Sequence, residues 1–328
     1  MVEKHLITGI TGQDGVFLTS HIINNNKDDL IYGFSRNENI KTFQQKLQHT
    51  LGNNLDINNV KIINNVDLLN EKDVDRLIKE IMPDYIYNLS GPSSVYKSML
   101  NGDKTDKTII KIFNNLIKPV INENLKCNFF QASSSEMFDA SSSRLDENSK
   151  FLPRSPYAEA KLYIHEDIQK IKSDYEVNIS SGIMFNHESE FRDDEYLIMK
   201  IINSAISIED KNINELKVGS LKLVRDWSYA KDIALAIYEI NKQGASEDYV
   251  IGSGVGNDIE TILEIVFTFF NLNWKDFVKI DNSLLREGDP ISIVSNPKKI
   301  KDRLNWESMI SLEETLIKCM EFKKSKRF

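Results

Sequence analysis

The stretch GITGQDGVFLTSHI, residues 9–22, follows the short apolar run His5–Ile7 and carries three glycines spaced three residues apart. Glycine has no Cβ atom, so a backbone with this spacing can approach a phosphate closely. The helix that would follow offers unpaired N–H groups and the positive end of its dipole. A plain tight turn is the alternative interpretation. The rest of the chain has to decide between a nucleotide-phosphate loop and a turn.

The composition is that of a globular protein. The chain has 328 residues, of which 41% are hydrophobic and 27% charged, which suffices for one large domain or two lobes. A net charge of −8 argues against a nucleic-acid surface but allows a local basic pocket. Cys127 and Cys319 lie far apart without metal-site spacing, so we expect no disulfide framework, no metal and a cytoplasmic protein. No apolar run reaches about 18 residues, so we expect neither export nor membrane insertion.

Short apolar runs alternate with longer amphipathic segments, and this rhythm is typical of βαβ units. The predicted strands are His5–Thr8, Leu30–Phe34, Val60–Ile63, Tyr85–Leu89, Cys127–Ser133 and Val177–Phe185, and the predicted helices between them are Gln13–Asn25, Glu71–Ile81, Lys104–Ile121 and Pro156–Lys172. Later helices are expected at Tyr196–Ile208 and Glu260–Phe270, separated by strand-like runs such as LKVGSLKLV, residues 216–224. The pattern predicts a doubly wound parallel, Rossmann-type sheet over residues 1–185, with returns near 220–245, and a smaller, interleaved substrate-binding lobe over 186–328.

This context favours the dinucleotide interpretation of the glycine loop, because the loop follows the first strand and opens the first helix. Its candidate cofactor-binding residues are Gly9, Thr11, Gly12, Gln13, Asp14 and Gly15. Arg36 ends the second strand where an acidic residue would bind the ribose of NAD, so NADP is the expected cofactor; a surface arginine without a ligand is the alternative. Asp67 follows the third strand, either against the adenine or as a helix cap. Leu68, Leu89, Ser90 and Ser93 complete the cofactor candidates after the third and fourth strands.

The segment SPYAEAKLY, residues 155–163, carries the most informative chemistry. Tyr157 and Lys161 are four residues apart and share one helical face. An ammonium beside a phenol, reinforced by an oxidised nicotinamide, favours the phenolate, which can take a proton from a hydroxyl group. Packing and solubility alone explain many such pairs. Here the pair follows a strand that ends in hydroxyls, and Ser134 can hydrogen-bond the reacting oxygen.

At this point the chain resembles the extended short-chain dehydrogenase/reductase superfamily, and within it the GDP-mannose 4,6-dehydratases. QASSSE (131–136) resembles their QASTSE, RSPYAEAKLY (154–163) their RSPYAVAKLY, and VRDWSYAKD (224–232) their KRDWGHAKD, while FNHES (185–189) is shared. The resemblance covers most of the chain in the same order. It implies an NADP-bound lyase that removes water from a nucleoside-diphosphate hexose and gives a 4-keto-6-deoxy sugar.

The resemblance also implies roles for single residues. Ser134 takes the place of the family's catalytic Thr, and Glu136, Tyr157 and Lys161 fall on its Glu, Tyr and Lys. His187 and Arg192 fall on cofactor contacts. Arg225 and Arg286 are expected to bind the substrate pyrophosphate, since planar guanidinium groups suit it. Asn186 and Lys200 join them, with a helix cap and a solvated side chain as the plainer alternatives. Glu136 could also be only a helix-start carboxylate.

Several positions depart from the family pattern. The family's NLAAQSHV is here NLSGPSSV, with Pro92 and Ser94 in place of a Gln and a His, which leaves the sugar open. ELYG becomes EMFD, and the loop that helps to pair subunits becomes NENIKTFQQK, so a homodimer and a homotetramer both remain open. Rival functions on the same scaffold are a nucleotide-sugar 4-dehydrogenase, a 4-keto reductase, an epimerase and a GDP-heptose dehydratase. A non-catalytic NADP-binding regulatory protein is a rival of another class.

Overall fold

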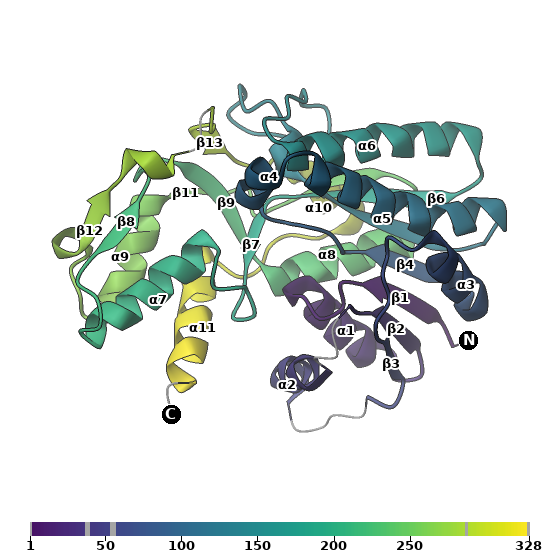
Figure 1. Ribbon diagram of the computed structural model, residues 1–328, viewed down its shortest axis with the longest axis horizontal. Helices are drawn as coiled ribbons and strands as arrows, with labels where there is room; N and C mark the ends of the chain where they lie inside the picture. Colours follow the sequence, from purple (N-terminus) through teal and green to yellow (C-terminus); the bar gives the residue numbers. More distant parts are fainter. Residues whose placement is uncertain (1, 37–39, 53–56, 286–287, 327–328) are drawn as a thin grey trace.

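Apolar strands and amphipathic helices alternate through the chain in a computed structural model that describes residues 2–36, 40–52, 57–285 and 288–326 (Figure 1). The larger part contains β1 (Lys4–Thr8), α1 (Gln13–Asn25), β2 (Leu30–Phe34), α2 (Ile40–Leu51), β3 (Val60–Ile63), α3 (Glu71–Ile81), β4 (Tyr85–Asn88), α4 (Val95–Asn101), α5 (Asp103–Asn122), β5 (Asn128–Ser134), α6 (Pro156–Asp174) and β6 (Asn178–Met184). The remaining elements are β7 (Asn186–Glu188), α7 (Leu197–Glu209), β8 (Leu216–Val218), β9 (Val224–Tyr229), α8 (Ala230–Gln243), β10 (Asp248–Ile251), β11 (Gly256–Asp258), α9 (Ile259–Phe269), β12 (Val278–Ile280), β13 (Ser292–Ile293), α10 (Lys298–Leu304) and α11 (Leu312–Ser325).

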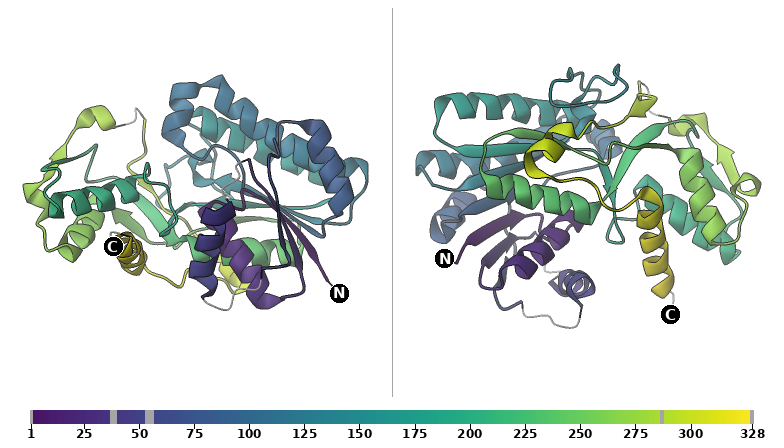
Figure 2. Two further views of the ribbon diagram at one scale, coloured as in Figure 1. Left: turned by 60° about the horizontal axis from the view of Figure 1, so that its bottom comes forward. Right: turned by 180° about the vertical axis from the view of Figure 1, so that it is seen from behind.

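The central sheet has seven parallel strands in the order β10-β6-β5-β4-β1-β2-β3. Successive strand residues point to opposite faces, so Leu6 packs with α3, α5 and α6, whereas Ile7 packs with α1, α2 and α8 (Figures 1 and 2). The chain runs outward in one direction from β1 and in the other from β4. The strand order therefore reverses between β1 and β4, which is where ligands bind in such sheets. The predicted doubly wound α/β fold is confirmed.

A smaller lobe lies at one end of this sheet (Figure 2). It contains β9 with its neighbours β7, β11 and β13, the pair β8 and β12, and the helices α7, α9 and α11 around a separate apolar core. The chain then returns to the larger part through α8, β10 and α10. The lobe therefore remains tied to the main sheet by several chain crossings.

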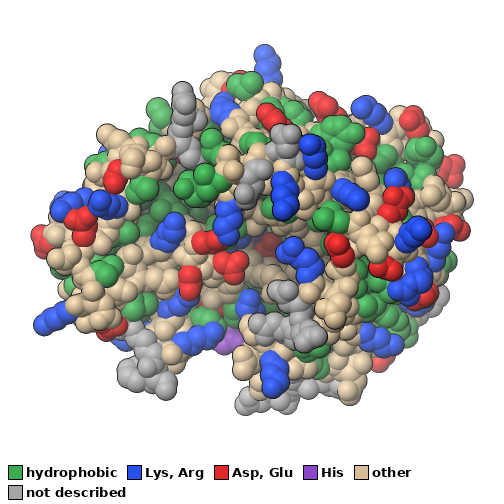
Figure 3. Space-filling view, viewed as in Figure 1, with side chains coloured by type: hydrophobic (Ala, Val, Ile, Leu, Met, Phe, Trp, Pro, Cys, Tyr) green, Lys and Arg blue, Asp and Glu red, His purple; other side chains and the backbone are tan. Residues whose placement is uncertain are grey.

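Most predicted element boundaries fall within one or two residues of the observed ones. The run 216–224 is the exception, because β8 ends at Val218 and β9 begins at Val224. A turn separates them, in which the Lys222 N–H donates to the Ser220 hydroxyl. Within the described ranges, no helix is both long and apolar enough to cross a bilayer. Basic and acidic side chains are interspersed over the face seen in Figure 3, so this face carries no continuous basic patch.

Candidate active site

The glycine loop joins β1 to α1 and lies close to the end of β4. Gly9 has a φ of +73°, and a Cβ atom on it would lie 2.9 Å from the Leu89 carbonyl oxygen. A Cβ atom on Gly15 would lie 2.5 Å from the Ile10 Cα atom, so α1 packs directly on the loop. Gly12 is exposed and immediately precedes the 13-residue helix α1. The loop thus presents bare backbone and a helix N-terminus, as phosphate binding requires.

The side chains at the start of α1 hold the segment that follows β6. Gln13 donates from Nε2 to the His187 carbonyl oxygen at 3.1 Å and accepts from the Ser189 hydroxyl at 2.8 Å. Asp14 and His187 form an ion pair, with Oδ2 and Nε2 3.2 Å apart. Burial opposes the charge on both groups, but their mutual attraction outweighs it, so the pKa of His187 is raised and that of Asp14 is lowered. Residues 174 positions apart therefore meet beside the loop.

The end of β5 and the start of α6 bring together the four predicted catalytic side chains. Ser134 is the last residue of β5, and its hydroxyl accepts from the Glu136 backbone N–H at 3.3 Å. Ser155 caps α6 just before Tyr157. The Ser134 hydroxyl also lies close enough to the Tyr157 phenol to lower its pKa. Lys161, one turn further along the helix, places its Nζ 5.6 Å from the centroid of the Tyr157 ring.

Burial dominates the titration of the Tyr157 and Lys161 pair. It raises the pKa of Tyr157 to about 12, with a smaller contribution from Glu136, while the nearby Ser134 hydroxyl acts in the opposite direction. Burial lowers the pKa of Lys161 to about 8, and the Lys161 ammonium donates to the Ala132 carbonyl oxygen at 2.8 Å. The lysine alone therefore does not produce the phenolate expected from the sequence. A further positive charge beside the phenol would favour it.

Residues that follow β7 contact the segment between β4 and α4. The Tyr196 hydroxyl lies 2.7 Å from the Ser93 hydroxyl, and the Arg192 guanidinium carbon lies 3.5 Å from the centroid of the Tyr196 ring. Arg192 Nε is 3.6 Å from a Glu188 carboxylate oxygen. Burial raises the pKa of Glu188 despite this arginine. The predicted cofactor residues Ser93 and Arg192 are thus linked through a tyrosine that sequence reasoning did not single out.

The remaining cofactor candidates lie at the same edge of the sheet. Arg36 is exposed, two residues beyond β2. Asp67 is exposed, and its Oδ1 accepts from the Leu69 N–H at 3.0 Å, so its carboxylate closes the turn before α3. Leu68 is buried in the core beneath this turn. Ser90 is half-buried next to the glycine loop.

The predicted substrate residues are more dispersed. Asn186 opens β7, and Lys200 is exposed on α7. Arg225 is 6% exposed, and its NH2 lies 2.8 Å from an Asp289 carboxylate oxygen while its NH1 donates to two carbonyl oxygens. In this structure the Arg225 guanidinium therefore binds an aspartate and backbone carbonyl oxygens of the same chain. Arg286 lies outside the described residues.

A pocket opens beside Glu136, at the carboxyl edge of the sheet. It is lined by Val95, Met99, Glu136, Arg154, Ser155, Gly288, Asp289, Pro290 and Ile293. Arg154 donates to the Phe138 carbonyl oxygen at 3.2 Å and therefore fixes the segment that follows Glu136. Sequence analysis does not select Arg154 or Met99 as site residues, because neither belongs to a spacing with chemical meaning. The lining of the pocket beside Glu136 therefore combines charged and apolar side chains.

Comparison with protein families supplies an independent result. The model of the GDP-mannose 4,6-dehydratase family matches residues 6–319. GDP-mannose 4,6 dehydratase 2 of Arabidopsis thaliana is 30% identical over 321 residues, which cover 96% of this chain and 85% of the relative. GDP-mannose 4,6-dehydratase of Yersinia enterocolitica is 29% identical over 348 residues, covering 95% of this chain and 91% of the relative.

Solved structures show the same fold at lower identity. The dTDP-glucose 4,6-dehydratase of Bacillus anthracis in complex with NAD has a TM-score of 0.82 at 19% identity, covering 99% of this chain and 98% of that chain. The UDP-glucose 4-epimerase of Thermotoga maritima with UDP-glucose has a TM-score of 0.83 at 19% identity, covering 99% of this chain and 100% of that chain.

Proposed function

The chain belongs to the GDP-mannose 4,6-dehydratase family, and we propose that it is an NADP-dependent nucleotide-sugar 4,6-dehydratase. Its substrate would be GDP-mannose or a close GDP-sugar, and its product the corresponding 4-keto-6-deoxy sugar. One observation carries this proposal beyond the fold. Glu136 lines a pocket and lies close enough to Tyr157 to affect its pKa, so a carboxylate for elimination is combined with a Ser–Tyr–Lys set for oxidation.

The loop residues fit a dinucleotide. Cβ atoms on Gly9 and Gly15 would collide with backbone, so the loop stays open to a ligand's phosphates. Asp14 Oδ1 and Arg192 Nε are buried near the loop and make no hydrogen bond with the described residues. When bound, a nicotinamide would supply the hydride acceptor for oxidation at C4, the hydride donor for C6 and, in its oxidised form, a positive charge beside the Tyr157 phenol.

Tyr157 acts as the base for the first step. Its phenolate takes the proton of the 4-hydroxyl group as C4 is oxidised to the ketone. Ser134, whose hydroxyl lies close enough to this phenol to affect its pKa, is placed to donate to the same sugar oxygen. Lys161 lies over the ring and stabilises the phenolate through its charge.

Glu136 performs the elimination. The 4-ketone acidifies the neighbouring C5–H, and the Glu136 carboxylate removes this proton. The resulting carboxylic acid protonates the 6-hydroxyl group, which leaves as water. Because one carboxyl group accepts and then donates the same proton, Glu136 ends in the state in which it began. As C6 receives the hydride, C5 takes up one proton, which balances the proton that Tyr157 took from the 4-hydroxyl group, so the phenolate is restored. The net reaction is loss of one water.

Three finer assignments belong to the same proposal. Exposed Arg36 at the end of β2 supports NADP over NAD, because its guanidinium can bind the 2′-phosphate. Two free, buried cysteines, Cys127 and Cys319, suit a reducing cytoplasm. A homodimer or homotetramer is the expected assembly.

A panel of nucleotide sugars incubated with purified protein and NADP tests the reaction. Mass spectrometry should detect the loss of one water from a GDP-hexose, with uridine and thymidine diphosphate sugars as controls. A product that has lost two hydrogen atoms and kept its oxygen would instead identify a 4-dehydrogenase. A GDP-heptose that reacts while GDP-mannose does not would correct the substrate.

A further inference from the structure

Helix α2 places a lysine against the glycine loop. Phe43 and Leu47 are buried and anchor α2 against α1. Lys46 precedes Leu47 in α2, and its side chain extends to the glycine loop, with its Nζ 3.4 Å from the Thr11 carbonyl oxygen. The same ammonium lies 5.7 Å from the centroid of the Phe191 ring. The Lys46 side chain therefore extends from α2 to both the glycine loop and the segment that follows β7.

The surroundings satisfy this ammonium incompletely. A lysine has three N–H donors, and among the described residues the one hydrogen bond found for Lys46 is the long contact to Thr11. Burial lowers its pKa, the charge of Asp193 opposes this, and that of Lys326 adds to it. Partial burial of a cation without a close anion is unfavourable. An anion bound at the loop would supply what is missing.

The neighbouring groups define which anion fits. The N-terminus of α1 and the exposed backbone of Gly12 lie directly after Thr11, and Arg36 lies at the end of the adjacent strand β2. We propose that Lys46 is a phosphate-binding residue of the cofactor site. This inference rests on the proposed function, which requires a nicotinamide dinucleotide at the loop. The phosphate is either the pyrophosphate, which NAD and NADP share, or the 2′-phosphate, which only NADP carries.

The test measures the Kd of NADP and of NAD by calorimetry for the wild type, Lys46→Met and Lys41→Met. Lys41 is an exposed lysine on the same helix and serves as the matched control. Lys46→Met should weaken NADP binding by about tenfold or more, as expected for loss of a charge-assisted contact. Lys41→Met should stay within about twofold of the wild type, and Lys46→Arg should restore most of the affinity.

The two cofactors separate the sources of the phosphate. An equal loss for NAD and NADP assigns Lys46 to the pyrophosphate, and a loss confined to NADP assigns it to the 2′-phosphate. Unchanged affinity for both would overturn the proposal and leave Lys46 as a tether between α2 and the loop. In that case Lys46→Met should lower the Tm of the ligand-free protein instead. A wild-type chain that binds neither cofactor would overturn the proposed function itself, and this inference with it.

Discussion

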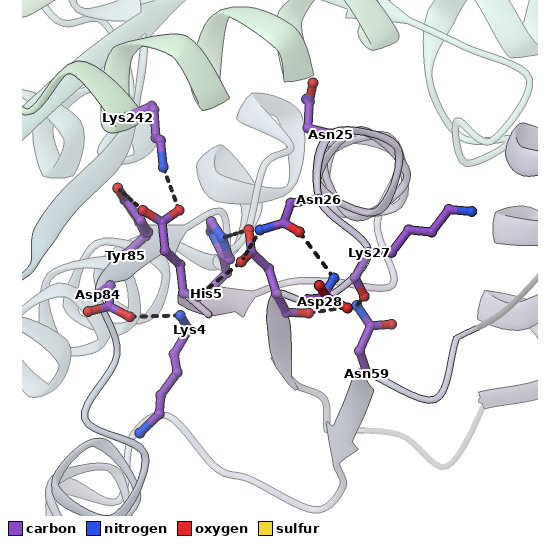
Figure 4. A network of polar contacts seen from close by, with 12 residues as sticks. Lys4, His5, Asn25, Asn26, Lys27, Asp28, Asn59, Asp84, Tyr85 and Lys242 are labelled. Atoms are coloured by element: carbon purple, nitrogen blue, oxygen red, sulfur yellow. Dashed lines mark hydrogen bonds and ion pairs between the residues drawn. The ribbon is translucent and has the colours of Figure 1, made fainter. Parts of the chain in front are cut away.

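The two ends of the parallel sheet each hold a lysine above a tyrosine ring, but the two lysines have different partners. At the amino end, Lys242 Nζ lies 4.9 Å from the centroid of the Tyr85 ring and forms an ion pair with Glu3 (Figure 4). At the carboxyl end, Lys161 lies 5.6 Å from the Tyr157 ring centroid and donates to a backbone carbonyl. Similar residue types therefore occupy different electrostatic settings.

Opposite pKa shifts follow from this difference. Burial acts against the charge of Lys242, but its interactions with Glu3 and Tyr85 together outweigh burial and raise its pKa. Among the described residues no carboxylate pairs with Lys161, and burial lowers its pKa to about 8. A charge neutralised inside the chain stabilises the fold. A buried ammonium that has no carboxylate partner, as at Lys161, is unfavourable for folding but can interact with a bound ligand. This distinguishes the candidate site from the cluster around Lys242 and Glu3.

The amino-end cluster also offers a set of metal-ligand atoms. Glu3, His5 and Asp29 place their ligand atoms within 4.8 Å of one another. Asp29 already accepts from the Glu3 N–H at 2.9 Å and from Asn26 at 2.7 Å, and Lys242 holds the Glu3 carboxylate (Figure 4). The Lys242 ammonium already neutralises the Glu3 carboxylate, so binding of a metal cation there would be opposed by charge repulsion. The cluster is best explained as a closed network that joins β1, β4 and α8.

Replacement of Tyr157 and of Tyr85 by phenylalanine should give the largest difference in kcat between the two ends of the sheet. Tyr157→Phe removes the base and should lower kcat by about a thousandfold or more, with little change in cofactor Kd. Tyr85→Phe removes only the hydrogen bond to Glu3 and should leave kcat within about twofold. Steady-state kinetics and calorimetry measure both effects. Near-normal turnover of Tyr157→Phe would remove this residue from the mechanism.

An exposed arginine at the end of β2 and an arginine in an ion pair on α3 provide the second contrast. Arg36→Asp should reverse the preference for NADP over NAD, with about 1.5 to 3 kcal/mol at stake in the contact with the 2′-phosphate. Arg76 forms an ion pair with Glu80 on α3, so Arg76→Asp should leave the Kd ratio unchanged. Equal affinity of the wild type for the two cofactors would contradict the role of Arg36.

The two lysines should differ in sign when stability is measured. Because the folded-state pKa of Lys161 lies near 8 and its ordinary value is 10.5, the unfolded chain binds more protons between these pH values, and wild-type stability rises across this range. Lys161→Met should therefore be more stable than the wild type at pH 7, by about 1 to 3 kcal/mol, and this gain should shrink as the pH approaches 10.5.

Lys242 should behave in the opposite way. Its raised pKa means that its contribution is present below pH 10.5 and is lost only above that value. Lys242→Met should lower the Tm at pH 7, by roughly 1 to 3 °C, because the ion pair is partly solvated. Thermal melts from pH 7 to 10.5 compare both variants. Destabilisation by Lys161→Met at pH 7 would show that its charge is compensated after all.

The smallest effect concerns the ion pair between Asp14 and His187. The lowered pKa of Asp14 gives stability above pH 3.8 that is lost as the pH falls through the folded value, and the raised pKa of His187 gives stability below pH 6.5 that is lost as the pH rises through the folded value. A double-mutant cycle with Asp14→Asn and His187→Asn should give a coupling of about 1 kcal/mol near pH 5.5, and less at pH 8.5. A coupling independent of pH would contradict the ion pair.

The sequence predicts the fold and the proximity of the four catalytic candidates because both depend on local patterns. Strand runs and the spacing of Tyr157 and Lys161 are short-range features, and the carboxyl ends of β5 and its neighbours must meet at one edge. Contacts such as Gln13 with His187 join distant segments through polar side chains, which leave no periodic signal. Helix α2 was missed because its stripe of Phe43 and Leu47 stands in a polar stretch. The pocket residue Arg154 was missed because it contacts the Phe138 carbonyl oxygen, in a loop that has no periodic pattern.

The central claim, elimination by Glu136, is tested most directly by a single turnover of Glu136→Gln with GDP-mannose, followed by the absorbance of reduced nicotinamide. The amide can neither take the C5 proton nor return it, so elimination should slow by about a hundredfold or more while oxidation at C4 persists. NADPH should then accumulate in Glu136→Gln but not in the wild type or in the control Glu3→Gln. Stoichiometric NADPH from the wild type, with a keto sugar that keeps its 6-hydroxyl group, would contradict the assignment and identify a 4-dehydrogenase.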